Sequence, residues 1–349
     1  MIEKPYFWLG VPIKGDPQPW REYRWRYGLM PNAYEILSSP RLDESVRKHG
    51  ISRFLDFQGN IAIDSGGYQF LYQLSTSIRP DDVLELYRNC KPDFGVVLDH
   101  PISPGLSLQR RRTRQAETLA NTRYMISHRV SRSPVLIPVI HGHHPITLGV
   151  YIKKLMSICD PPVIAIGSVV PSIFSTTGAA TSYQAIRALA FIRRKLPDKV
   201  LHVFGVGSIM TMHLMYYAGI DSVDSSAWRI KAAYGAIQLP GICDRNVTGK
   251  SAKAKYKRLS KKERQVLDSC RCPICRAEGI AHLKKSFQAR AIHNSWVYQS
   301  EVDLVRRLMR SGEYERYVER TLSSNPRFSK ILTVLKNYKS KGSPVSLVN

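Results

Sequence analysis

Short apolar runs rich in valine and isoleucine recur along the chain, and nearly all of them end in polar or glycine residues. Runs that are apolar on both faces are typical of strands in a parallel sheet that is covered by helices. The six clearest runs are IAIDSGG (61–67), FGVVLDH (94–100), VLIPVIHG (135–142), VIAIGSVV (163–170), LHVFGVGS (201–208) and GIDSVDSS (219–226).

Segments with helical length and charged faces lie between these runs, namely 79–90, 108–130, 181–196 and 208–220. Such alternation predicts an α/β protein built from repeated βαβ units. YFWLGVPI (6–13) and AYEILSSP (33–40) are expected to supply further strands, which brings their number to about eight. We therefore predict a closed (β/α)₈ barrel, with an open doubly wound sheet as the alternative.

The ends of the apolar runs carry residues suited to chemistry. Catalytic groups in a (β/α)₈ barrel lie where strands end and loops begin, so these residues are expected to line one mouth. Glycines there let a planar ligand approach the backbone closely. Taken singly, each residue is more simply a strand-end cap or part of the core. The residues are Asp64, Asp99, His141, Gly167, Gly205 and Asp224.

The chain is strongly basic, with 52 Lys and Arg against 27 Asp and Glu in 349 residues and a formal net charge of +25. Such an excess favours contact with a polyanion, most often nucleic acid. No apolar run of about 18 residues occurs, and the first residues lack a signal-peptide pattern. We predict a soluble, cytoplasmic protein with no membrane partner.

Several motifs stand in a defined order between about residue 60 and residue 297: DSGGYQ, VVLDHP, IAIGSVVPS, FGVGS, GIDSVDSSAW, and CRCPIC with a later IHNSW. In this order they resemble the guanine transglycosylases, which exchange guanine for a 7-deazaguanine base in nucleic acid. The resemblance implies a pentosyltransferase with a (β/α)₈ TIM barrel and an inserted zinc-binding subdomain.

The resemblance assigns two catalytic carboxylates. Base exchange without cleavage of the phosphate backbone requires displacement at the sugar C1′, for which a carboxylate is a suitable nucleophile. Asp224 matches the nucleophile, which forms a covalent aspartyl-glycosyl intermediate, and Asp64 matches the general acid and base. The nearby Asp221 is expected to bind a backbone amide or cap a turn instead.

The resemblance also implies a slot for a flipped-out base. Asp99 is expected to accept hydrogen bonds from the N1 and N2 hydrogens of a guanine-like base. His141, Gly142 and His143 stand where the bacterial pattern of the family has a glutamine and two glycines, so an imidazole is expected to face the base. The remaining residues of the predicted slot are Ser65, Gly167, Ser168 and Phe204.

DSSAW and IGSVVPS look more like the archaeal and DNA-modifying branches, which implies 7-cyano-7-deazaguanine (preQ0) as the incoming base. Because few residues follow His293, we predict DNA as the substrate, with tRNA as the alternative. A non-catalytic nucleic-acid-binding subunit is a further alternative. Helper proteins of a DNA-modification system and a homodimer are the other partners considered. A barrel glycosidase acting on sugars would leave the basic surface and the cysteine cluster unexplained.

The cysteines Cys270, Cys272 and Cys275 are tightly spaced as C-x-C-x₂-C, which in a large chain indicates a metal site rather than a disulfide framework. With His293 they would close a tetrahedral structural zinc site. His282 is the competing fourth ligand, and we favour His293 because IHN opens the next helix as it does in the family.

A basic segment, residues 245–264, has nine Lys or Arg and one acid. It is expected to grip phosphates, although a charge run is often only a solvated face. Residues 109–115 and 193–199 are expected to extend this basic surface. The predicted domains are 1–243 (barrel core), 244–295 (basic segment and zinc subdomain), 296–335 (helices completing the barrel) and 336–349 (frayed tail).

Overall fold

The computed structural model describes residues 3–71, 78–103, 105–130, 134–142, 144–174, 179–249 and 256–340. Parts of three predicted features lie outside the described residues. These parts are His143, residues 250–255 of the basic segment and residues 341–349 of the tail. No helix in the described part of the chain is long and apolar enough to cross a membrane.

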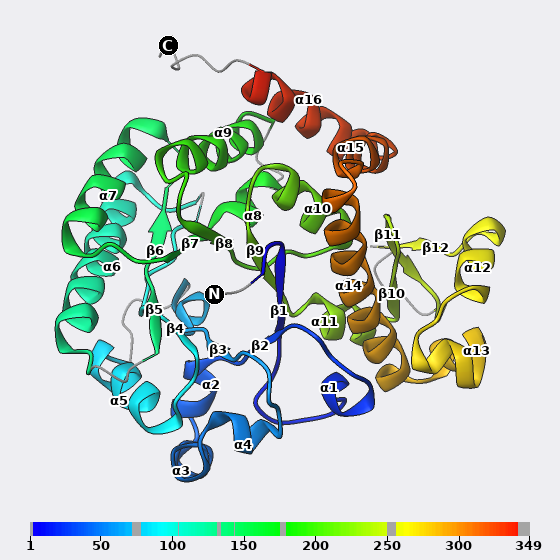
Figure 1. The fold of residues 1–349 in the computed structure, drawn as a ribbon, viewed down its shortest axis with the longest axis horizontal. Coiled ribbons are helices and arrows are strands. Elements are labelled where there is room, and N and C mark those ends of the chain that lie inside the picture. The colour runs from blue at the N-terminus through cyan, green and yellow to red at the C-terminus, as the bar shows by residue number, and fades with distance from the viewer. Residues whose placement is uncertain are drawn as a thin grey trace.

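The predicted barrel is confirmed, and Figure 1 shows its strands as a ring surrounded by helices. The strands are β1 (Tyr6–Gly10), β2 (Gly28–Met30), β3 (Ala62–Ile63), β4 (Phe94–Val96), β5 (Val135–Ile137), β6 (Val139–His141), β7 (Val163–Gly167), β8 (Val200–Val203) and β9 (Ser222–Ser225). All pairings among them are parallel.

Three features close the ring. β9 pairs with β1, and a bridge between Leu29 and Ile61 joins β2 to β3. β5 and β6 occupy one position in the ring and are separated by Pro138, which has no amide hydrogen for the ladder. The closed ring rules out the alternative of an open doubly wound sheet.

The helices that follow the strands form the outer layer of the barrel (Figure 1). The four predicted helical segments are confirmed as α5 (Pro80–Cys90), α6 (Leu108–His128), α9 (Ala179–Lys195) and α10 (Ile209–Tyr217). The others are α1 (Pro19–Glu22), α2 (Ala33–Leu37), α3 (Pro40–His49), α4 (Ile51–Leu55), α7 (Pro145–Ile158), α8 (Val169–Ile173), α11 (Ala227–Ala233), α14 (Phe287–Arg310), α15 (Tyr314–Ser323) and α16 (Pro326–Ser340).

One predicted strand is wrong. Residues 33–40 form helix α2 and the start of α3, and the second strand of the barrel is β2 instead. The physical reason is a helix cap, because the side chain of Asn32 accepts hydrogen bonds from the backbone amides of Tyr34 and Glu35. In a run this short, the spacing of the apolar residues does not distinguish a strand from a short helix such as α2.

A packed core fills the barrel below its mouth. Val96, Ile137, Val139, Val163, Ala165 and Val200 form one buried cluster, against which Phe94 and Phe204 pack. Small and branched side chains of this kind are typical of barrel interiors. The polar residues that end the strands therefore lie above this core.

A small subdomain follows β9 and α11 and lies beside the barrel against α14 (Figure 1). It consists of β10 (Ala236–Leu239), β11 (Ile242–Asn246), β12 (Lys257–Arg258), α12 (Lys261–Asp268) and α13 (Pro273–Lys285). Its own apolar cluster contains Ile237, Leu239, Leu267 and Leu283. The predicted boundary between residues 295 and 296 falls within α14, which is continuous there, and the domain division stays a prediction.

Candidate active site and zinc centre

The carboxylate of Asp224 lies on β9 at the mouth of the barrel and is 9% exposed. Its Oδ1 accepts a hydrogen bond of 2.8 Å from the amide of Gly205, which follows β8 and has a φ of +74°. Among the described residues, no hydrogen bond reaches its Oδ2. One oxygen is thus anchored while the other is left for a nucleophilic role, which suits the role predicted for Asp224.

Asp64 follows β3 and is partly buried. The Asn32 side-chain amide donates to Asp64 Oδ2 at 3.1 Å, so the residue that caps α2 also holds this carboxyl group. Burial, together with the negative charges of Asp99 and Asp224, raises the pKa of Asp64 to about 8. At neutral pH the group is therefore mostly protonated and suited to act as a general acid.

Asp99 is the third carboxylate at the mouth and is 5% exposed. Its Oδ1 accepts from Ser65 Oγ at 2.9 Å, and its Oδ2 lies 2.8 Å from Nε2 of His141. Each carboxylate oxygen can accept a second hydrogen bond, so both remain available to a ligand. The structure thus places His141 against Asp99, and the predicted contact between His141 and the base stays a prediction.

The backbone around Asp99 is closely packed. A Cβ at Gly67 would lie 2.3 Å from Asp99 Oδ1, and a Cβ at Gly167 would lie 2.3 Å from Cε1 of His141. Neither position tolerates a side chain without displacement of these groups. Ser168 follows Gly167, and its Oγ accepts from the amide of Ile102 at 3.0 Å.

Two polar residues near the site were not predicted from the sequence. Asn32 holds Asp64, and His202 on β8 places its Nε2 3.4 Å from Asp224 Oδ1. His202 precedes Phe204 by two residues, and strand residues two apart point to the same face. The period of the strand could therefore have identified His202 as a barrel-interior residue beside Phe204, which is partly buried and meets the imidazole edge-on.

Asp221 behaves as predicted, because its Oδ2 accepts from the backbone amide of Leu201 at 2.9 Å. It also pairs with Arg193 at 2.8 Å and with Lys4 at 3.1 Å. These contacts lie where β8 and β9 begin, at the opposite end of the barrel from Asp224.

The same contacts correct the prediction for residues 193–199. This segment leads into the start of β8, away from the mouth, and Arg193 and Lys199 are occupied by Asp221 and Asp160. In the segment 245–264, Arg245 is paired with Glu263. Five cations of its described part are exposed: Lys257, Arg258, Lys261, Lys262 and Arg264.

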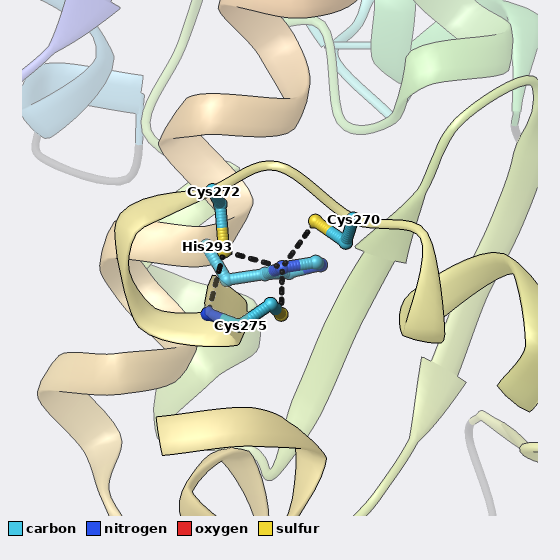
Figure 2. Close-up of side chains that lie close together, drawn as sticks. All are labelled: Cys270, Cys272, Cys275 and His293. Atoms are coloured by element: carbon cyan, nitrogen blue, oxygen red, sulfur yellow. Dashed lines mark hydrogen bonds between the residues drawn. The ribbon is translucent and has the colours of Figure 1, made fainter. Parts of the chain in front are cut away.

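The zinc ligands predicted from the sequence are brought together in the structure, as Figure 2 shows. Their ligand atoms all lie within 4.8 Å of one another. Nδ1 of His293 lies 3.7, 3.4 and 3.5 Å from the sulfur atoms of Cys270, Cys272 and Cys275. Ligand bonds of about 2.3 Å to sulfur and 2.0 to 2.1 Å to nitrogen in a tetrahedral site put such atoms about 3.6 Å apart.

The surroundings of the ligands also fit zinc. His293 Nε2 lies 3.0 Å from the carbonyl oxygen of Gln238, to which it donates, so Nδ1 is left free to bind the metal. The competing ligand His282 pairs instead with Glu278 at 2.8 Å. Three thiolates and an imidazole leave no open coordination position, so the zinc is structural.

A closed barrel with three carboxylates at its mouth and a Cys₃His zinc centre beside it defines the class of protein. The family model described as queuine tRNA-ribosyltransferase (TGT) matches residues 25–327, and the chain belongs to this family of pentosyltransferases.

Curated relatives are similar over most of this chain. The tRNA-guanine(15) transglycosylase of Thermococcus kodakarensis is 26% identical over 326 residues, which cover 91% of this chain and 52% of the relative. The protein of the same name from Pyrococcus furiosus is 25% identical over 304 residues, with 86% and 48% covered. The chain spans about half the length of the curated relatives it matches.

The raised pKa of Asp64 predicts a pH-dependent stability. A carboxyl group with a pKa of about 8 when folded and about 3.9 when unfolded lowers the free energy of unfolding as pH rises between these values. Asp64→Asn removes this effect. The stability of the variant relative to wild type should therefore increase by about 4 kcal/mol between pH 5 and pH 9, with most of the increase below pH 8. Urea denaturation at pH 5, 7 and 9 measures it.

The exposed Asp198 provides the control. Asp198→Asn should differ from wild type by the same small amount at each pH. A stability difference for Asp64→Asn that does not change with pH would show that this carboxyl group is not protonated in the folded protein.

Proposed function

We propose that this chain is a guanine transglycosylase that exchanges guanine in tRNA for a 7-deazaguanine base. The observation that carries the proposal is the meeting of Asp64, Asp99 and Asp224 at one mouth in three different environments. Carboxylates with different surroundings take different roles in one reaction. Membership of the family and the names of its archaeal relatives support the same reaction.

The first step releases guanine. Oδ2 of Asp224 attacks C1′ of the target nucleotide while the bond from C1′ to the guanine ring nitrogen breaks. Asp64, which is protonated at neutral pH, gives its proton to the departing base. The products of this step are free guanine, an Asp64 carboxylate and a sugar bound covalently to Asp224.

The second step inserts the new base and restores the enzyme. The Asp64 carboxylate removes the proton from the ring nitrogen of the incoming base, which attacks C1′ and displaces Asp224. The phosphate backbone is not cut in either step. In both, Asp99 accepts hydrogen bonds from the N1 and N2 hydrogens of the base, which fixes its orientation, and Ser65, Gly167, Ser168 and Phe204 form the proposed slot.

The zinc centre has no part in these steps. When bound, zinc fixes the loop of three cysteines to α14, and α14 contacts β1 of the barrel. The exposed cations of β12 and α12 are proposed to bind the phosphates of the nucleic acid.

The substrate is proposed to be tRNA, because the relatives are named for tRNA. The prediction of DNA rested on the number of residues after His293 and on the motifs that look archaeal or DNA-modifying, and the comparisons give it no support. The incoming base is proposed to be 7-cyano-7-deazaguanine, as the likeness of DSSAW and IGSVVPS to the archaeal branch implies. A non-catalytic subunit would not need the three carboxylates together. Helper proteins and a homodimer stay predictions.

The test is base exchange with the purified, zinc-loaded protein. Unmodified tRNA and guanine-containing DNA are each incubated with 7-cyano-7-deazaguanine, digested to nucleosides and analysed by mass spectrometry. We expect the modified nucleoside in tRNA. Incorporation into DNA alone would replace the substrate proposed here, and incorporation into neither, with zinc bound and tRNA binding intact, would contradict a catalytic role for the isolated chain.

A further inference from the structure

We propose that His141 and His202 are positioning residues, each a neutral imidazole that carries its hydrogen on Nε2 and holds one carboxylate of the site. His141 holds Asp99, the base reader, and His202 holds Asp224, the nucleophile. This inference rests on the proposed function, and assigns to two histidines roles that the motifs do not contain.

The contacts of His202 indicate where its hydrogen lies. The indole nitrogen of Trp8 donates to Ser222 Oγ at 3.0 Å, since an indole N–H can only donate. Ser222 Oγ lies 3.0 Å from His202 Nδ1, and its own hydrogen is free to point there. With the Ser222 hydrogen directed at Nδ1, Nδ1 is the acceptor and the imidazole hydrogen lies on Nε2. Nε2 is 3.4 Å from Asp224 Oδ1, close to the carboxylate but not aligned as a hydrogen bond.

The burial of His202 supports this assignment. His202 is 1% exposed, and its Nε2 makes no hydrogen bond to a described residue, although Asp224 Oδ1 lies 3.4 Å away. A buried N–H without an acceptor is costly, which indicates that it serves the nearby carboxylate. Gly205 and His202 both face Oδ1, so attack on the sugar is left to Oδ2.

A second chain of contacts leads to Asp99 in the same way. The backbone amide of Ile102 can only donate, and it donates to Ser168 Oγ at 3.0 Å. Ser168 Oγ lies 3.1 Å from His141 Nδ1, and His141 Nε2 lies 2.8 Å from Asp99 Oδ2. An ionised carboxylate only accepts, so Nε2 carries the hydrogen.

The two chains therefore share one order: an obligatory donor, a serine, a histidine and a carboxylate. A neutral imidazole orients a carboxylate and favours its ionised form without cancelling its charge. For Asp224 this preserves the negative charge that attacks C1′. For Asp99 it preserves the acceptor that reads the base, in a pocket where His141 is completely buried.

Steady-state kinetics test the two roles separately. His202→Leu should lower kcat about 10-fold or more with the KM for the incoming base nearly unchanged, since the polar contact that orients the nucleophile is lost. His141→Leu should raise the KM for the base about 10-fold or more. Gln at either position retains an N–H donor and should restore part of the loss.

His213→Gln is the matched control. His213 is also buried and lies 2.7 Å from a carboxylate, Glu301, but far from the mouth between α10 and α14. This variant should lower stability while leaving both kcat and KM within about two-fold of wild type. The Leu variants of His141 and His202 could instead lose activity only because less of the protein is folded, with kcat and KM per folded molecule unchanged as in His213→Gln. In that case the positioning roles are wrong.

The protonation pattern is measured without any activity. Two-bond ¹H–¹⁵N correlation spectra of zinc-loaded protein labelled in histidine, assigned with the two Gln variants, should show the neutral Nε2–H form for His141 and His202. An Nδ1–H form or an imidazolium at either position would overturn the inference for that residue, even if the wild type exchanges bases. If both histidines show the Nε2–H form but the protein does not exchange bases in tRNA, the proposed function is refuted and the assignment of the hydrogens stands.

Discussion

Replacing Asp224 by asparagine should lower the turnover of base exchange by about 10⁴-fold or more, because loss of a nucleophile removes the covalent route altogether. The amide retains the shape of the side chain and can still accept the hydrogen bond from the amide of Gly205. Folding and binding of tRNA should therefore be preserved. The measurement is the rate of guanine incorporation into tRNA, with tRNA affinity measured in parallel.

Asp221→Asn is the matched control, three residues away on the same segment. Its carboxylate bonds Arg193 and the amide of Leu201 at the opposite end of the barrel, so this change should reduce stability and leave turnover per folded molecule unchanged. Full turnover in Asp224→Asn, or loss in both variants alike, would refute the nucleophile assignment.

Removal of zinc should have the largest effect on structure. Structural zinc sites contribute an apparent binding free energy of about 10 to 16 kcal/mol in zinc-finger peptides, and this small subdomain has few apolar residues of its own to replace it. We expect a chelator or Cys272→Ser to unravel the subdomain. Zinc content and hydrogen exchange of α12 and α13 measure this result.

Cys90→Ser provides a control for loss of a buried thiol, because Cys90 lies on α5, away from the cluster. It should retain zinc and the protection of α12 and α13 from exchange. If Cys272→Ser keeps its zinc and the protection of α12 and α13 from exchange, the fold of the subdomain does not depend on zinc bound by this cluster.

Much of the fold could be predicted because a parallel barrel leaves a periodic signal. Buried strands give continuous apolar runs, and each polar residue that ends a run marks the same mouth. The zinc ligands were also predictable, since three of them are close in sequence and the fourth lies in the next helix. The helix begins at Phe287, however, so His293 lies within α14 and does not open it as predicted. Helix α2 was missed because its five residues are too short for a helical period, and only the cap at Asn32 distinguishes it.

The finer features of the site depend on tertiary contacts. The hydrogen bond from Asn32 to Asp64 and the raised pKa of Asp64 arise from residues that only the closed ring brings together. His141 lies against Asp99 because Gly167 leaves room for the imidazole against the backbone. No local pattern encodes that orientation, since it depends on the register of three neighbouring strands.

The most direct measurement is isolation of the covalent intermediate. The zinc-loaded protein is mixed with tRNA without an incoming base, denatured rapidly, and digested for mass spectrometry of the peptide that contains Asp224. The proposed mechanism predicts a nucleotide attached to Asp224, absent from Asp224→Asn and lost when a base is added before denaturation. Exchange activity with no adduct, or an adduct on another residue, would contradict it.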